Sequence, residues 1–347
     1  MAPRAAASIG IGAAARGAGL RSLRAAFVLF ALVAFVALIG PGCSRDAAED
    51  GNGPSRDAAS RDGSTALRAV DARGREVVLA APPRRIVSLA PSNTEIIFAL
   101  GLGDRLVGRD PWSDEPEAAR AVPSIGDVYP RPNLEAIVLR EPDLVLGAGV
   151  TNEDAAAALE GLGIPVYVAA RPEDLETVVR DIERIGALVG REAEARRIVS
   201  TLEARIAAVA ARAATVPLEA RPRVFYELDG ADPLRPWTAG SGTLVDELIG
   251  IAGGRNIAHE AGDGYFVLGL EAIILADPEI ILLGSATHGG TDIESVRRRP
   301  GWSALRAVAE GRVYALDDDL VSRPGPRIAE GVETLASRIL PRGGEDE

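Results

Sequence analysis

The chain of 347 residues lacks the residue types on which many metal and disulfide sites depend. It contains no lysine, one cysteine (Cys43), one methionine (Met1) and two histidines, His259 and His288. One cysteine excludes an intramolecular disulfide framework, and two histidines are too few for a multi-histidine metal cage. The 50 acidic side chains outnumber the 38 basic ones, giving a formal net charge of −12, and no basic run occurs. This balance argues against nucleic acid as a partner.

The first 42 residues have the pattern of a secretory signal. Residues 1–24 contain four arginines and no acid, and an apolar run of about 15 residues follows from Ala25 to Ile39. A membrane span needs about 20 residues, so this length suits a signal-peptide core better. The run ends at Gly40-Pro41-Gly42-Cys43, which resembles a bacterial lipobox. We predict a lipoprotein signal peptide over 1–42 and lipidation of Cys43, with a plain transmembrane anchor as the alternative.

The segment that follows Cys43 is polar and repetitive. Residues 44–66 have no aromatic and almost no aliphatic side chain, and the motif SRDAA occurs twice. Such a segment buries too little apolar area to offset the entropy of ordering it. We predict a disordered tether over 43–66.

The body of the chain alternates between strand and helix patterns. Hydrophobic residues make up 47% of the chain, ample for a packed core. A hairpin is predicted around 67–80, then short strands near 86–89, 106–107, 144–146 and 165–168. Ser92 and Glu95 have the spacing of a capping box, for a helix ending at Gly101. This alternation predicts an α/β lobe with a mostly parallel sheet over 67–170.

A helical segment separates this lobe from a second one. Apolar residues repeat at three and four positions from Leu175 to Leu188 and, after Gly190, from Ile198 to Val209. The second of these helices is about 20 residues long, roughly 30 Å. We predict a helical connector over 171–217 and a second α/β lobe over 218–347.

One stretch of sequence occurs twice. LEAIVLREPDLVL starts at Leu134 and LEAIILADPEIILL starts at Leu270. Both indicate a helix, an acidic-proline turn and a strand, and each places a glutamate, Glu135 or Glu271, in the first helical turn, where the dipole favours an anion. The repeat indicates two similar lobes related by rough symmetry.

Ligands of α/β sheets bind at the loops that follow the strands. These loops are predicted at about 109–117, 147–153, 229–242, 284–290 and 317–326. Trp112 and Trp237 lie in them, and Tyr129 and Tyr265 lie in the loops before the repeated helices. Across a cleft, such aromatic rings would stack on a large flat ligand; alternatively, each covers the core of its own lobe.

Other polar candidates are fewer, and enzyme signatures are missing. Arg323, in a post-strand loop, could pair with a ligand carboxylate or phosphate. His288 could be an axial metal ligand, although a polar turn residue is the simpler reading, and His259 is the weaker candidate. Ala239 stands where a G-x-S-x-G nucleophile elbow would begin, and neither a Walker A run nor a dinucleotide-binding glycine motif occurs. We predict no catalysis, no bound metal and no cofactor.

Several segments together resemble the helical-backbone class of ABC-transporter solute-binding proteins, which captures cobalamin, ferric siderophores and haem. They are RRIVSLAPSNTEIIFALGLGDRLVG, NLEAIVLREPDLVLG, TAGSGTLVDELIGIAGGRNIA, LEAIILADPEIILL and RPGWSALRAVAEGRVYALDDDLVSRPGPRI. The resemblance covers about residues 66–342. It implies two Rossmann-like α/β lobes joined by a single long α-helix, with a ligand cleft between them.

The resemblance also implies roles for individual residues. The family presents one glutamate per lobe to arginines of a membrane permease, and the matching positions are Glu135 and Glu271. The chain is most similar to the cobalamin-binding branch. Trp112 of this chain lies where proteins of that branch have a corrin-contacting tyrosine, Trp237 matches a phenylalanine of theirs, and Tyr265 matches a tryptophan. Tyr129 lies near the branch's tryptophan in the first lobe, and the segment around Arg323 is similar as well.

The resemblance therefore implies a monomeric, lipid-anchored protein of the cell envelope, periplasmic or extracytoplasmic. It would capture a corrinoid (cobalamin) or another metal chelate and deliver it to a permease and its ATPase. Two alternatives stay open: a ferric-siderophore or haem binding protein of the same class, with Tyr129 or His288 as the axial ligand of haem, and a ligand-sensing lipoprotein without transport.

Overall fold

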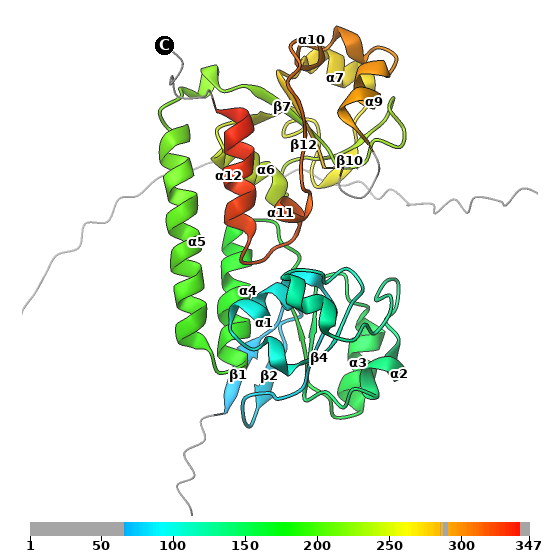
Figure 1. Ribbon diagram of the computed structural model, residues 1–347, viewed down its shortest axis with the longest axis vertical. Coiled ribbons are helices and arrows are strands. Elements are labelled where there is room, and N and C mark those ends of the chain that lie inside the picture. Colours follow the sequence, from blue (N-terminus) through cyan, green and yellow to red (C-terminus); the bar gives the residue numbers. More distant parts are fainter. Residues whose placement is uncertain (1–65, 285, 287–290, 341–347) are drawn as a thin grey trace, which may run out of the picture. The chain divides into compact units, whose positions relative to one another are not determined.

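A computed structural model describes residues 66–284, 286 and 291–340 (Figure 1). The predicted signal peptide, Cys43, the tether up to residue 65 and His288 lie outside these residues. Within the described ranges, none of the helices combines the length and apolar character needed to cross a bilayer.

The first lobe is built on a parallel sheet in the order β4-β3-β5-β6. A hairpin of β1 and β2 precedes it, as predicted, and its strands pair antiparallel. Its elements are β1 (Leu67–Val70), β2 (Glu76–Leu79), β3 (Ile86–Ser88), α1 (Pro91–Ala99), β4 (Leu106–Arg109), α2 (Leu134–Val138), β5 (Leu144–Gly147), α3 (Glu153–Gly161) and β6 (Val166–Val168). The strands β3, β5 and β6 are fully buried, as expected for a parallel sheet covered on both faces.

The second lobe repeats this plan with the parallel order β12-β11-β7-β9 and adds an antiparallel ribbon of β8 and β10. Its elements are β7 (Arg223–Glu227), β8 (Trp237–Ala239), α6 (Leu244–Ile251), β9 (Arg255–Asn256), β10 (Tyr265–Val267), α7 (Leu270–Ala276), β11 (Ile280–Leu283), α9 (Ile293–Arg298), α10 (Arg306–Ala309), β12 (Val313–Ala315), α11 (Asp319–Ser322) and α12 (Ile328–Ile339). Trp302 is fully buried in this lobe, and its indole N–H donates to the Pro233 carbonyl at 2.9 Å.

The predicted duplication is visible in the backbone. An acidic residue in the left-handed region follows each of the helices α2 and α7: Glu141 (φ 48°) is the third residue after α2, and Asp277 (φ 43°) is the C-cap of α7. These are the only non-glycine residues with positive φ in the described chain. Two residues later, Asp143 accepts a hydrogen bond from the Arg85 N–H at 2.8 Å and Glu279 accepts one from the Arg223 N–H at 2.9 Å. Each acid thus binds the backbone at the start of the neighbouring strand, β3 in the first lobe and β7 in the second. The two lobes therefore share local contacts as well as topology.

Two helices connect the lobes: α4 (Leu175–Leu188) and the longer α5 (Glu192–Ala213), which has 22 residues. The two helices approach closely at Gly186, where an added Cβ would lie 2.3 Å from the Cβ of Ala195. Helix α12 packs along α5 (Figure 1), and Arg205 of α5 binds Glu333 of α12 through two hydrogen bonds of 2.8 and 2.7 Å. The predicted fold, two α/β lobes with a long helix between them, is confirmed.

The connector shares its core with both lobes. One buried cluster contains Ile86 and Leu144 of the first sheet, Ile182 of α4, Leu202 of α5 and Leu282 of the second sheet. Because interiors packed in this way resist deformation, the connector is held firmly against both sheets.

Candidate functional site

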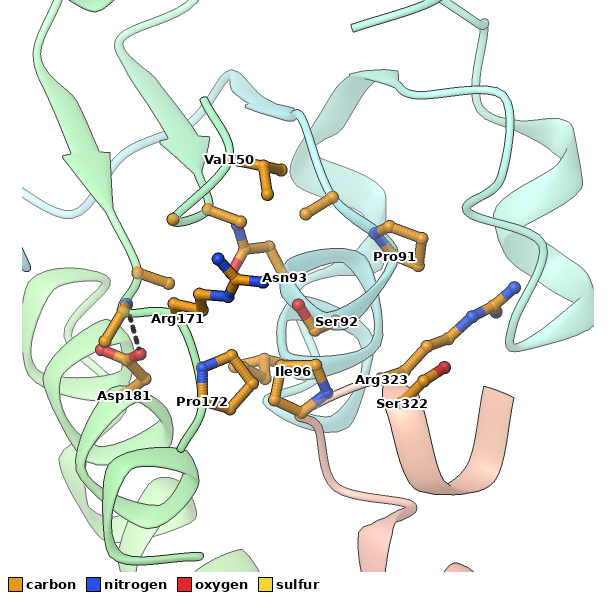
Figure 2. Close-up of a pocket in the computed structure, with 16 residues that line it drawn as sticks. Pro91, Ser92, Asn93, Ile96, Val150, Arg171, Pro172, Asp181, Ser322 and Arg323 are labelled. Atoms are coloured by element: carbon orange, nitrogen blue, oxygen red, sulfur yellow. Dashed lines mark hydrogen bonds between the residues drawn. The ribbon is translucent and has the colours of Figure 1, made fainter. Parts of the chain in front are cut away.

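A hollow of about 220 Å³ opens at the carboxyl ends of β3, β5 and β6. It is lined by residues 90–93, 148–150, 169–172 and 322–324, together with Ile96 and Asp181. Figure 2 shows that Pro91, Ser92 and Ile96 face Arg171 and Pro172 across it. Ser322 is the last residue of α11, and Arg323 follows it. This is the edge of a parallel sheet at which ligands bind in α/β folds.

The loop after β3 is arranged differently from the predicted capping box. Helix α1 begins at Pro91 with Ala90 as its N-cap, and no side chain caps it. Proline is suited to the first helical position because its missing N–H has no acceptor there. The capping-box prediction is therefore wrong. Asn93 instead donates to the Gly147 carbonyl at 2.9 Å, which ties α1 to the end of β5.

The loop after β6 is held by helix α4. Asp181 accepts hydrogen bonds from the Ala170 N–H and the Tyr167 hydroxyl, both at 2.7 Å (the first is dashed in Figure 2). Gly149 approaches this loop so closely that an added Cβ would lie 2.8 Å from the backbone nitrogen of Arg171. The backbone beside Arg171 is thus set by contacts on both sides, which positions its side chain at the hollow.

Arg171 links the hollow to the second lobe. Its guanidinium carbon lies 5.9 Å from the centre of the Tyr265 ring, within the range of a cation–π contact. Burial raises the pKa of Tyr265, and the charge of nearby Asp318 adds to the effect. Tyr265 is half-buried, so one part of the ring packs in its own lobe and another part stays accessible.

Trp237 and Tyr265 lie on one two-stranded ribbon. The sequence placed both in loops, but Trp237 begins β8 and Tyr265 begins β10. Trp237 pairs with Val267, and Ala239 pairs with Tyr265. Since residues two apart share a face of a strand, both rings lie on the same face as diagonal neighbours. Trp237 is exposed on this face.

The Trp112 loop follows β4 and rests on a buried polar network. Asp110 accepts the Trp112 N–H at 2.9 Å and also binds the Ser113 hydroxyl. The Thr94 hydroxyl lies 2.8 Å from the Ser113 oxygen and 2.9 Å from the Ser88 oxygen. Burial raises the pKa of Asp110 despite these hydrogen bonds. The network anchors the loop to β3 and α1, while the Trp112 side chain is exposed.

Arg323, which follows α11, lies close to carboxylates of the first lobe and of α11. Its guanidinium lies 2.9 Å from Asp114, 2.6 Å from Asp319 and 3.7 Å from Glu95. Arg327 also lies 3.7 Å from Glu95, whose two oxygens are buried and accept no hydrogen bond. Burial outweighs both guanidinium groups and raises the pKa of Glu95 to about 7. In Figure 2 the Arg323 side chain extends away from Arg171, so its charge is directed at these carboxylates.

The other predicted residues lie on the surface. Tyr129 is exposed in the loop before α2 and is not among the residues that line the hollow. Glu135 and Glu271 are both exposed in the first turns of α2 and α7. Arg323 lines the hollow, and Tyr265 and Trp237 lie on the β8–β10 ribbon. Trp112 lies two residues before Asp114, which binds Arg323.

Sequence reasoning missed the loops at 90–93 and 169–172. Both follow strands that were predicted, so the rule that selected the other post-strand loops could have found Ser92, Asn93 and Arg171 as well. No signal in the sequence indicated which of these loops would meet the segment around Arg323.

A second hollow, of about 600 Å³, lies beside α6 and β9 and includes Arg223 at the amino end of β7. His259 lies at this hollow, with its Nδ1 2.7 Å from Asp246. The carboxyl ends of the strands, where α/β proteins bind ligands, lie at the opposite edge of the sheet. Nowhere in the described chain do three or more His, Cys, Asp or Glu residues gather in a way that could hold a metal ion.

Two parallel-sheet lobes joined by a long helix, with a hollow at the strand ends, define a two-lobe α/β solute-binding protein. Residues 86–320 match the family described as periplasmic binding protein, and the chain belongs to this family.

Individual relatives support this assignment. The chain is 34% identical over 274 residues to the ABC transporter substrate-binding lipoprotein YvrC of Bacillus subtilis, covering 78% of this chain and 84% of the relative. It is 31% identical over 274 residues to a cobalamin-binding protein of Halobacterium salinarum, covering 77% and 72% of the two chains. The solved periplasmic heme-binding protein RhuT of Roseiflexus sp. RS-1 superposes with a TM-score of 0.66 at 31% identity, covering 74% of this chain and 97% of that one.

Proposed function

We propose that this chain is a lipid-anchored solute-binding protein that captures a corrinoid and delivers it to an ABC importer, without catalysing a reaction. The observation that carries the proposal is the hollow at the strand ends, which the Arg171–Tyr265 contact connects to an aromatic ribbon. The cobalamin-binding relative at 31% identity supports the choice of ligand.

The ligand would bind mainly through aromatic and apolar contacts. Pockets for drug-sized ligands occupy about 300–1,000 Å³, so a hollow of about 220 Å³ accommodates one part of a corrinoid. The rest of the ligand would stack on Trp112, Trp237 and Tyr265, with Tyr129 at its edge. Arg323 would contribute through its stem and by fixing the Trp112 loop, since its guanidinium binds Asp114.

Delivery would use features outside the hollow. Cys43 would carry the lipid that anchors the protein on the outer side of the membrane, which the lipoprotein named among the relatives supports. Glu135 and Glu271, one per lobe and both exposed, would pair with cations of the permease. Charged contacts at separated points fix orientation and speed encounter more than they add affinity.

Haem is the second candidate ligand. The solved heme-binding relative matches this chain at the same 31% identity as the cobalamin-binding one, and the exposed Tyr129 hydroxyl could approach an iron. The aromatic ribbon would serve a porphyrin as well as a corrin, because both are large and flat.

Calorimetric titration of the mature chain with cyanocobalamin, haemin and a ferric hydroxamate siderophore tests the function and the ligand together. We expect 1:1 binding of cyanocobalamin, and a loss of tenfold or more in affinity for Trp237→Ala, since buried aromatic anchors dominate such sites. Leu162→Ala, an exposed leucine at the end of α3, is the control and should bind normally. Binding of haemin alone would replace the ligand, and binding of none of the three would refute the function.

The docking role is tested by uptake. Glu135→Ala combined with Glu271→Ala should abolish transport of labelled ligand into cells while leaving the Kd nearly unchanged. A large loss of affinity with transport intact would contradict the assignment.

A further inference from the structure

The hollow at the carboxyl ends of β3, β5 and β6 contains a cation that no carboxylate of the described chain neutralises. Arg171 and Arg323 are the two cationic residues in its lining. Three carboxylates surround the guanidinium of Arg323. Arg171 forms no ion pair with any described residue, and its guanidinium lies over the ring of Tyr265 at 5.9 Å. The charge of Arg171 is therefore available to a ligand.

The acid in the lining, Asp181, does not serve as the partner of Arg171. Both oxygens of Asp181 are occupied, one by the Tyr167 hydroxyl and the other by the Ala170 N–H. Burial raises the pKa of Asp181, and the cations that lower it belong to α4 itself. The carboxylate is thus directed at its own helix and loop, and Arg171 keeps its positive charge at the hollow.

The start of α1 lies opposite Arg171 and presents unpaired donors. Helix α1 has no side-chain cap and no acid in its first turn. The N–H groups of Ser92 and Asn93 find no acceptor among the described residues. The first turn of a helix favours anions, because its free N–H groups and the helix dipole both attract negative charge.

The side chain of Ser92 is independent evidence that the hollow takes a ligand. Ser92 is only 6% exposed, and its hydroxyl makes no hydrogen bond to any residue in the described part of the chain. Figure 2 shows this hydroxyl directed into the hollow that Arg171 also lines. Because buried polar groups are normally hydrogen-bonded, this hydroxyl requires a partner from outside the chain.

We propose that the hollow is an anion subsite, in which the Arg171 guanidinium, the Ser92 hydroxyl and the free N–H groups of α1 bind a phosphate or carboxylate of the captured ligand. The inference rests on the proposed function and deepens it, since it states which part of the ligand enters the hollow. A volume of about 220 Å³ is below that of pockets for whole drug-sized ligands and suits one such group. Arg171, through Tyr265, would join the anion to the aromatic ribbon.

Two kinds of ligand could supply the anion. Cobalamin carries a phosphodiester in its nucleotide loop, and haem carries two propionates. Calorimetric titration of the mature chain therefore uses two pairs of compounds: cyanocobalamin with dicyanocobinamide, which lacks the nucleotide loop and its phosphate, and haemin with haemin dimethyl ester. For the pair that contains its ligand, the wild type should bind the anionic member about tenfold more tightly or better, as expected for hydrogen bonds to a charged group.

Variants of the subsite should reduce this ratio of affinities. Arg171→Met keeps the apolar stem without the charge and should bring the ratio to about twofold or less, and Ser92→Ala should lower it about threefold, the amount of one ordinary hydrogen bond. Arg197→Met on α5, whose side chain is 74% exposed, removes the same charge outside the hollow and should keep the wild-type ratio.

The ratio also separates recognition of an anion from a structural role. If Arg171 acted only by holding Tyr265, Arg171→Met would weaken both members of a pair equally and leave the ratio unchanged, which would overturn the inference. A ratio that falls because only the anionic member is bound more weakly supports it.

The outcomes distinguish this inference from the proposed function. A wild type that binds none of the four compounds refutes the proposed function, and the inference fails with it. A wild type that binds both members of a pair equally well overturns only the inference. A preference within the cobalamin pair supports the inference with the phosphodiester as the anion, and a preference within the haemin pair supports it with a propionate.

Discussion

Glu95 should make the protein less stable as the pH rises, and replacing it with glutamine should remove this dependence. Its side chain lies in α1, is 4% exposed, and makes no hydrogen bond through either oxygen. Burial has the largest effect on its pKa and raises it, Arg327 and Arg323 lower it, and Glu115 and Asp319 raise it, so that the pKa moves from 4.5 to about 7. Burial therefore outweighs the two guanidinium groups.

The sign follows from proton linkage. Between pH 4.5 and 7 the folded protein keeps a proton on Glu95 that the unfolded chain releases, so stability falls as the pH rises through this window. At about 1.36 kcal/mol per pKa unit, the full loss is roughly 3 kcal/mol, of which about 2 develops between pH 5.5 and 8. Glutamine stays neutral throughout, so Glu95→Gln should gain about 2 kcal/mol on the wild type over this range.

Urea unfolding of both proteins at several pH values, followed by circular dichroism, measures this difference. Glu333→Gln on α12 is the control: Arg205 lowers the pKa of Glu333 through a hydrogen bond, so that variant should lose stability relative to the wild type once the carboxylate ionises. A wild type that gains on Glu95→Gln as the pH rises would show that the arginines outweigh burial and would refute the reasoning.

Two further predictions concern ion pairs of different burial. Arg299 and Glu227 form an almost completely buried ion pair, so Arg299→Ala should lower the free energy of unfolding, measured in urea, by about 3–5 kcal/mol. Arg298→Ala, at an exposed position, is the control and should lower it by less than about 0.5 kcal/mol. Equal losses for the two variants would contradict the role of burial. The exposed pair between Arg205 and Glu333 joins α5 to α12, and a double-mutant cycle should give a coupling below about 1 kcal/mol; a larger value would mean that the pair, rather than the apolar face of α12, holds the two helices together.

Much of the fold could be predicted because its signals are local. The periodicity from Leu175 to Val209 predicted α4 and α5 on either side of Gly190, and the repeated segment at Leu134 and Leu270 predicted two lobes with the same plan. Helix and strand periods depend on neighbours a few residues apart, so a single sequence contains them. The family resemblance implied the same helical connection between the lobes.

The candidate site was predicted less completely. Arg323 was predicted as a ligand contact and does line the hollow, but its hydrogen bond to Asp114, 209 residues earlier in the chain, could not be predicted. Trp237 and Tyr265 were expected in separate loops, but they share a face of the β8–β10 ribbon. The spacing of Ser92 and Glu95 indicated a capping box, but Glu95 is buried near two arginines and takes no part in capping.

The sequence by itself therefore determined the α/β lobes, their duplication, the helical connector and the family, because local patterns and the matched segments carry that information. Only the tertiary structure decided that Arg171 meets Tyr265, that Arg323 lies among Glu95, Asp114 and Asp319, and that the hollow forms at the ends of β3, β5 and β6. These contacts join segments that are far apart along the chain. They form only when both sheets pack around the connector, and local helix and strand propensities do not specify that packing.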